Sequence, residues 1–423
     1  MARRGTRATR EPSPGVMDQS TIRRHNLSVV LRHVRDHGPC SRAQLAEATG
    51  LTKTGVAKIV DDLIDRGLIQ DLGIVSVPRV GRPASMLVVN GAALACVGAE
   101  VNLYHAATLV TDLVGRELFR ARRAMDGRQA PPQVLAAVRG LLDQSLQAAT
   151  EACRAIGSIT VTLPGLVNPA AGVVVNSPIL GWRDVPLRAE IARLLGVGPA
   201  QVAVDSIANL AALAESRLPE HQGVRSLVRL ELGAGIGAGH VVDGRLQRGA
   251  GGSAGAIGHV MFDPKGPMCR CGRAGCLDAF AGLTALLRAA APDLLESRAD
   301  DPVEQLGEVA RRAARGEKRA LAGIGEVGTW VGRGAATLIN LQDPEVLVLG
   351  GYVKSLRPWI LPAIERELEL RVFAPDRAGS RVSVSPLGPD GALAGAVQLG
   401  RDRVLEDLTA DSGGWEEQEA AGG

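Results

Sequence analysis

Three cysteines and one histidine lie close together near the middle of the chain, within the run GHVMFDPKGPMCRCGRAGC. Three thiolates and one imidazole are a common ligand set for a structural zinc ion, which they surround as a tetrahedron. The other cysteines are scattered singly along the sequence, so the spacing favours a shared metal over unrelated free thiols. We therefore predict a structural zinc site with the ligands His259, Cys269, Cys271 and Cys276.

Disulfide bonds are the alternative use of these cysteines. Disulfides persist in oxidising compartments, but the chain begins with basic, polar sequence and shows no apolar signal stretch. No window approaches the roughly 18 uninterrupted apolar residues that a membrane helix requires. We expect reduced thiols, a cytoplasmic protein and no membrane partner.

The length of 423 residues predicts two or three domains with sizeable cores. A hydrophobic content of 46% indicates a globular protein, and 52 glycines with only 2% aromatic residues indicate tight turns and cores of Ala, Val and Leu. Positive charge is concentrated at the N-terminal end: residues 1–85 carry 14 Lys and Arg against 8 Asp and Glu, and the rest carries 34 against 37. This asymmetry points to nucleic acid or a membrane surface as the partner of that segment.

Residues 20–90 have the pattern of a winged helix-turn-helix domain, preceded by a basic arm (1–19) that we expect to be disordered. A first helix with apolar residues at helical spacing should end at Gly38-Pro39. Ser41 and Gln44 form a capping box that opens a second short helix, and Gly50 supplies the turn after it. Thr52 then caps a third helix, whose apolar stripe leaves a polar, cationic face at its N-terminal half.

The second and third helices make a helix-turn-helix, in which the third helix enters the major groove. Short strands are expected at Leu68-Ile69, Val75–Val77 and Met86–Val89, with the cationic loop 78–83 between the last two as a wing. A small helical interaction domain is the alternative. We predict that double-stranded DNA is the partner and that the contacts come from Arg42, Thr52, Lys53, Thr54, Lys58, Arg79 and Arg82.

The rest of the chain contains glycine loops after strand-like apolar runs, such as Gly233–Gly239 after VRLEL and Gly350-Gly351 after PEVLVL. Such loops can hold phosphates with backbone N–H groups, although tight strand connections have the same composition. Together with LPGLVN (163–168), NSPILGWRDVPL (176–187), VDSIANLAALAE (204–215), GAIGH (255–259) and CRCGRAGCLD (269–278), they make this sequence resemble the ROK family of repressors, open reading frames and sugar kinases.

The resemblance implies an α/β fold: an N-terminal winged helix-turn-helix followed by an actin-like, ribonuclease-H-type ROK domain of two lobes over residues 91–404, with ligand sites in the cleft between the lobes. It also implies a homodimer or homotetramer. The residues after 404 (405–423) are acidic and are expected to form a disordered tail.

Several departures from the ROK kinase pattern argue against an enzyme. The position of the kinases' general base, an Asp, is Ile207 here, and an isoleucine cannot accept a proton. The first phosphate loop of the kinases corresponds to Glu100–Tyr104, which contains no glycine, and the second contains Ala234. We predict no kinase activity, no catalytic residue and no nucleotide cofactor.

The sugar pocket implied by the resemblance is altered as well. Ile179, Ser206 and Ala256 stand where the family has polar groups that contact the sugar, whereas His259 and Asp278 remain usable. We assign Ser206, His259 and Asp278 as effector-binding residues and expect a less polar ligand, a modified sugar or no ligand.

The sequence thus predicts a nucleoid-associated transcriptional repressor of carbohydrate metabolism, controlled by a sugar-like or other small effector. A sugar kinase with an appended DNA-binding domain and a partner-binding protein are the alternatives.

Overall fold

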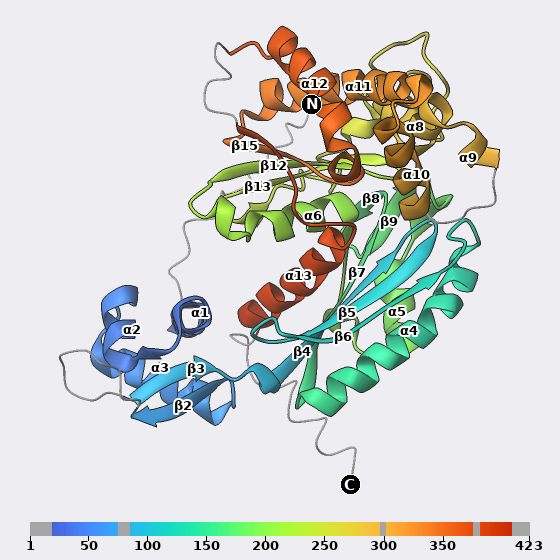
Figure 1. The fold of residues 1–423 in the computed structure, drawn as a ribbon. Coiled ribbons are helices and arrows are strands. Elements are labelled where there is room, and N and C mark those ends of the chain that lie inside the picture. Colours follow the sequence, from blue (N-terminus) through green and yellow to red (C-terminus); the bar gives the residue numbers. More distant parts are fainter. Residues whose placement is uncertain (1–18, 75–84, 297–301, 375–380, 408–423) are drawn as a thin grey trace, which may run out of the picture. The chain divides into compact units, whose positions relative to one another are not determined.

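The computed structural model describes residues 19–74, 85–296, 302–374 and 381–407 (Figure 1). Contacts within the chain divide it into two compact units. The first contains the described residues up to Asn90 and those from Arg403 onward, and the second runs from Gly91 to Asp402. Among the described residues, none of the helices combines the length and the apolar character needed to cross a membrane.

The first unit is three helices and a small antiparallel sheet. The helices pack around a core of buried aliphatic side chains, to which α1 contributes Leu27, Val30, Leu31 and Val34. The sheet has the strand order β1-β3-β2, so that β3 lies between the other two strands. Its elements are α1 (Gln19–His37), β1 (Cys40–Ser41), α2 (Arg42–Thr49), α3 (Lys53–Asp65), β2 (Ile69–Ile74) and β3 (Ser85–Val89).

Local sequence rules explain where these helices begin and end. The Ser41 side chain accepts from the backbone N–H of Gln44, whose own side chain accepts from the Ser41 N–H, so the predicted capping box is confirmed. Gly50 takes the left-handed conformation (φ 71°) and ends α2, and the Thr52 side chain caps α3. The predicted strand 75–77 and the wing loop 78–83 lie outside the described residues.

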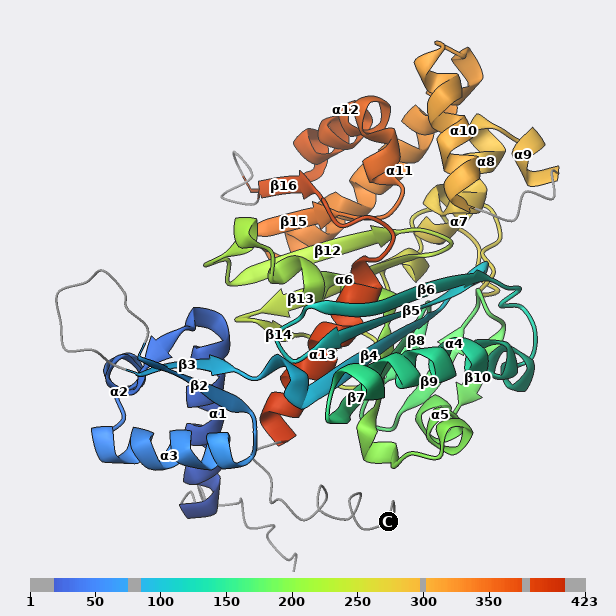
Figure 2. The same cartoon turned by 60° about the horizontal axis from the view of Figure 1, so that its bottom comes forward.

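The second unit begins with a lobe built on a five-stranded sheet of order β11-β7-β4-β5-β6. Helix α4 lies on one face of this sheet (Figure 2). Its Val134, Val138 and Leu142 are buried in the core of this lobe. A second sheet, β10-β9-β8, joins the same hydrophobic core. The elements are β4 (Leu94–Val101), β5 (His105–Asp112), β6 (Glu117–Ala124), α4 (Pro131–Ala152), β7 (Ala155–Leu163), β8 (Leu166–Asn168), β9 (Val173–Ser177), β10 (Trp182–Val185), α5 (Leu187–Leu195) and β11 (Val202–Ser206).

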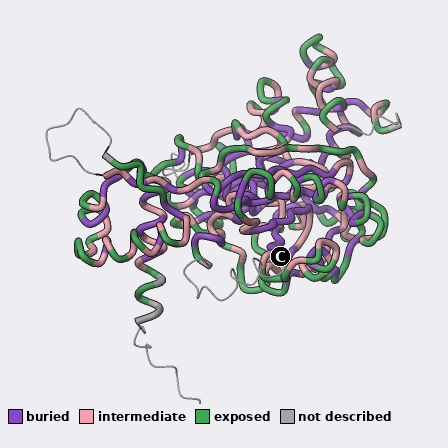
Figure 3. Tube along the Cα trace, turned by 90° about the horizontal axis from the view of Figure 1, so that it is seen from below, coloured by how far each residue is buried: buried purple, intermediate pink, exposed green. Residues whose placement is uncertain are grey.

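The other lobe is built on a sheet of order β14-β13-β12-β15-β16, whose largest core cluster lies between the sheet and a group of helices. Figure 3 shows buried chain running through the middle of this unit. The strands are β12 (Ser226–Leu232), β13 (Ile236–Val242), β14 (Arg245–Leu246), β15 (Val346–Leu349) and β16 (Arg381–Val384). The helices are α7 (Leu277–Ala281), α8 (Leu283–Ala290), α9 (Asp293–Glu296), α10 (Pro302–Ala314), α11 (Lys318–Gln342) and α12 (Val353–Arg371).

Two helices connect the lobes. Helix α6 (Ile207–Ser216) follows β11 of the first lobe and packs on β12 and β13 of the second. Helix α13 (Gly391–Asp407) places Leu393 and Val397 against Ala107 and Leu109 of β5. Helix α13 continues to Asp407, so residues 405–407, which we expected to begin a disordered tail, form the end of this helix.

Candidate effector site, metal cluster and nucleic-acid interface

Helix α3 presents an exposed polar face at its N-terminal end. Val56, Val60 and Leu63 are buried in the first unit, so the helix has a fixed inner side. Lys53 and Lys58 are exposed, and neither takes part in an ion pair among the described residues. Thr54 is also exposed. An exposed helix N-terminus with free ammonium groups suits contact with phosphates.

The other predicted DNA contacts differ in their surroundings. The Thr52 hydroxyl accepts from the Gly55 N–H at 3.1 Å, which fixes the start of α3. Arg42 forms ion pairs with Asp61 and Asp71, each at 3.1 Å, so its guanidinium ties the start of α2 to α3 and β2. Sequence spacing did not show these partners because they are 19 and 29 residues away. Arg79 and Arg82 lie outside the described residues.

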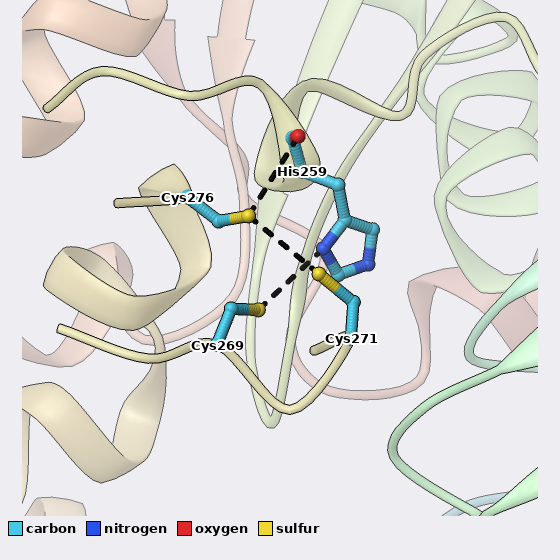
Figure 4. A group of neighbouring side chains, drawn as sticks. All are labelled: His259, Cys269, Cys271 and Cys276. Carbon is cyan, nitrogen blue, oxygen red and sulfur yellow. Dashed lines mark hydrogen bonds between the residues drawn. The ribbon is translucent and has the colours of Figure 1, made fainter. Parts of the chain in front are cut away.

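The predicted metal ligands converge on one point (Figure 4). The Cys269 sulfur lies 3.7 Å from Nδ1 of His259, and the Cys271 and Cys276 sulfurs lie 3.6 Å apart. All four potential ligand atoms lie within 4.8 Å of one another. A tetrahedral zinc ion with ordinary bond lengths would hold such atoms roughly 3.5–3.8 Å apart. The cluster therefore has the size of a four-coordinate metal site.

The backbone shapes this cluster through two glycines. Gly272 and Gly275 have φ values of 87° and 70°, which other residues rarely adopt. At Gly275 a Cβ would also collide with the backbone carbonyl oxygen of Asp263, so the loop can close only with glycine there. Burial, with the Arg273 charge, lowers the pKa of the His259 imidazole, which favours the neutral form that a metal binds.

The predicted effector residues meet in one cavity. Ser206, His259 and Asp278 all line a cavity of ≈ 350 Å³ between the two lobes of the second unit. Burial raises the pKa of Asp278 to about 6, against the opposing charge of Arg270. Its Oδ1 atom is buried and has no hydrogen-bond partner among the described residues. This oxygen is available to a ligand hydroxyl.

Apolar side chains occupy part of this cavity. Ile179, Ile207 and Ala256 are in its lining, as the sequence suggested. Ile179 reaches across to the glycine loop, since a Cβ on Gly235 would collide with its Cδ1 atom. The space between the lobes is therefore narrowed by an aliphatic contact.

The cavity also contains polar residues that the sequence did not single out. Asn176 and Arg183 are cross-strand partners on β9 and β10, and both line it. Arg273, from the loop that carries the cysteines, lines it as well. Trp182, beside Arg183, is buried and donates from its indole N–H to the Gln129 carbonyl, so it packs in the core. Asn176, Arg183 and Arg273 supply polar groups in addition to the predicted effector residues.

A second cavity, of ≈ 230 Å³, lies along the glycine loops. Its wall contains two carboxylates, Glu100 and Glu231, and two cations, Arg122 and Lys354. Glu100 accepts from Nδ2 of Asn102 at 2.7 Å and lies 3.3 Å from His105. Glu231 pairs with the buried Arg229 at 2.8 Å and lines both cavities.

Two family patterns match this chain: MarR family over residues 28–72 and ROK family over residues 96–403. The second match covers most of the sequence and both cavities. The chain belongs to the ROK family. A MarR-type helix-turn-helix ahead of a ROK domain is the organisation of a ROK transcriptional regulator, and it confirms the fold class predicted from the sequence.

Curated ROK relatives match along nearly their whole length. A putative xylose repressor of Caldicellulosiruptor sp. (strain Rt8B.4) is 28% identical over 401 residues, covering 93% of this chain and 98% of the relative. The DNA-binding transcriptional dual regulator NagC of Escherichia coli (strain K12) is 27% identical, covering 92% and 95%.

Solved ROK structures have the same fold. A ROK family transcriptional regulator described as a homolog of the E. coli MLC protein has a TM-score of 0.75 at 26% identity, over 91% of this chain and 97% of the other. A ROK family glucokinase from Streptomyces griseus, in complex with glucose and AMPPNP, has a TM-score of 0.61 at 25% identity, over 73% of this chain and 99% of the other. The regulator thus matches a larger share of this chain than the kinase does.

Proposed function

We propose that this protein is a transcriptional repressor that binds an operator through its first unit and a small effector in its ROK domain, without phosphorylating the effector. The observation that carries the proposal is the exposed, cationic N-terminal face of α3 in a helix-turn-helix joined to a ROK domain. Relatives named as repressors, matched over nearly their full length, support the same function.

The DNA contacts are assigned to the face of α3 and the wing. Lys53, Thr54 and Lys58 reach base edges or phosphates in the major groove, and Thr52 fixes the helix start. Arg79 and Arg82 complete the interface from the wing loop. Arg42 acts mainly as a structural link, because two carboxylates already balance its charge.

The residue that activates the sugar hydroxyl in the ROK kinases has no acidic counterpart at its position here. Ile207 occupies the position of the ROK kinases' general base and cannot accept a proton. The nearby Asp205 does not replace that base. One of its oxygens accepts from the Ser206 N–H and from Nδ2 of Asn209, each at 2.8 Å, and the other accepts from Arg248 at 2.8 Å.

The glycine-loop cavity is also unsuited to a nucleotide triphosphate. Asn102 and Tyr104 line it, and they belong to the segment Glu100–Tyr104, which lacks the glycines of the kinases' first phosphate loop, so side chains hinder the close approach of phosphates to the backbone. A kinase with an appended DNA-binding domain remains the second candidate because the glucokinase fold matches. Turnover of any sugar in a coupled ATP assay would favour it.

The cluster of His259 with the three cysteines is assigned to a structural zinc ion. Its donor set and spacing suit zinc, and the ion would hold the loop that brings both His259 and Arg273 to the cavity. We infer that two or more copies assemble on a roughly palindromic operator, whose half-sites lie one helical turn, about 34–36 Å, or a multiple apart. Effector binding between the lobes would change the separation of the two DNA-binding units and release the operator.

Footprinting of the purified full-length protein on fragments selected from its own genome tests this function. We expect protection of discrete sites with two-fold symmetry, and loss of protection when Lys53 and Lys58 are both replaced by Ala. Protection without sequence preference, or protection unaffected by these replacements, would refute the assignment of the interface.

A further inference from the structure

The effector cavity contains two arginines from opposite lobes. Arg183 lies on β10 in the first lobe, and Arg273 lies in the cysteine loop of the second. Both side chains are exposed, and neither guanidinium forms a hydrogen bond or an ion pair with another described residue. A guanidinium without an anionic partner, placed at a cavity wall, is a ready binding group for a carboxylate or a phosphate.

The geometry around Arg183 fixes where its side chain goes. Arg183 is directly opposite Asn176 on the antiparallel strand β9, so the two side chains emerge on the same face. The next residue, Asp184, has φ 51°, a conformation that is uncommon for a non-glycine residue. Such strain is often found beside binding sites, where it sets the direction of a side chain.

The acidic groups of the cavity do not cancel these arginines. Glu231 is already paired with Arg229 at 2.8 Å. Asp278 comes from α7 and keeps a buried oxygen without a partner, which suits a sugar hydroxyl as donor. With a divalent metal bound, the three thiolates would give the cysteine cluster a net negative charge. That charge would partly balance the nearby Arg273, but it would not balance Arg183. The cavity therefore offers hydroxyl-binding groups at one part of its wall and cationic groups at another.

We propose that the effector of this protein is an acidic carbohydrate whose carboxylate or phosphate is held by Arg183 and Arg273, while its hydroxyls contact Asn176, Ser206 and Asp278. The inference rests on the proposed role of this cavity as the effector site. An anion bound by both arginines bridges the two lobes, so it stabilises the arrangement in which both line one cavity. Neutral sugars contact the same hydroxyl-binding groups but leave both arginines unpaired.

Calorimetric titration of the full-length, metal-loaded protein tests the proposal. The probes are matched sets of a neutral sugar, its uronic or aldonic acid and its 6-phosphate, built on glucose, galactose, mannose and N-acetylglucosamine, with xylose and xylonate in addition. At least one acid or phosphate should bind about 10- to 100-fold more tightly than its neutral counterpart, because hydrogen bonds to charged groups are stronger than neutral ones. The acid and phosphate arms distinguish the two sources of the anion.

Substitution of each arginine locates the binding group. Arg183→Gln and Arg273→Gln should each remove most of the preference for the anionic probe, with metal content and thermal unfolding unchanged. Arg193→Gln is the matched control, since Arg193 is 76% exposed on α5 and pairs with Glu190 outside the cavity. Tighter binding of a neutral sugar, binding of no acidic probe, or an unchanged preference in both cavity variants would overturn the proposal. Operator binding is measured separately in the absence of any probe, so that failure of the regulatory function is distinguished from failure of this inference.

Discussion

Replacement of Lys53 and Lys58 by Ala should reduce the salt dependence of operator binding. Both ammonium groups are exposed on α3 and form no ion pair among the described residues, so each can displace one counterion from a phosphate. The slope of log K against log salt is negative, and each lost phosphate contact reduces its magnitude by about 0.9. The two lysines together account for about 1.8 in each protomer. When the salt concentration rises from about 50 to about 200 mM, both proteins lose affinity for the operator. The factor by which affinity falls should be about 12 times smaller, per protomer, for the double variant than for the wild type.

Fluorescence anisotropy with a labelled operator, measured at several salt concentrations, gives these slopes directly. Arg42→Ala serves as the control on the same domain, because Asp61 and Asp71 already balance its guanidinium. This variant should leave the slope nearly unchanged. It should lower the free energy of unfolding of the first unit by only about 0–1 kcal/mol, which is the usual contribution of partly exposed ion pairs. Equal slopes for the wild type and the lysine variant, or a larger slope change for the arginine variant, would refute this account of the interface.

Three further outcomes are expected. Arg229→Ala should destabilise the second unit by about 3–5 kcal/mol in chemical denaturation, because it leaves the buried carboxylate of Glu215 without its partner at 2.9 Å. Cys276→Ser should lower the zinc content measured by elemental analysis and lower the melting temperature, and the same melting temperature with full zinc content would contradict the ligand assignment. Ile207→Asp should still give no sugar phosphorylation in a coupled assay, because the segment Glu100–Tyr104 lacks the glycines of the kinases' first phosphate loop; measurable turnover would show that the missing base is the only obstacle.

The features that the sequence predicted well depend on residues close together in the chain. The capping box of Ser41 and the cap of Thr52 each involve residues three positions apart in the chain, and both form as expected. The candidate metal ligands also lie within a short loop, so their types and spacing were enough to bring them together. Hydrophobic periodicity and capping were sufficient to place the helices of the first unit.

The features that the sequence did not reveal depend on strand register and on contacts between distant segments. Arg183 lines the cavity beside Asn176 only because β9 and β10 pair in one particular register, which no local pattern encodes. The same limit applies to Arg42, whose role depends on carboxylates from α3 and β2. The available signal for Arg183 was a pair of charged residues, Arg183 and Asp184, within the largely apolar motif GWRDVPL.

Genome-wide occupancy of the tagged protein in its own host, followed by footprinting of the purified protein at a stated salt concentration, tests the central claim most directly. Discrete sites of two-fold symmetry, with half-sites one or more whole helical turns apart and lost in the Lys53 and Lys58 double variant, are the predicted result. An occupancy profile without enriched sites, together with ATP-dependent turnover of a sugar by the same protein, would contradict the account and assign the ROK domain to catalysis.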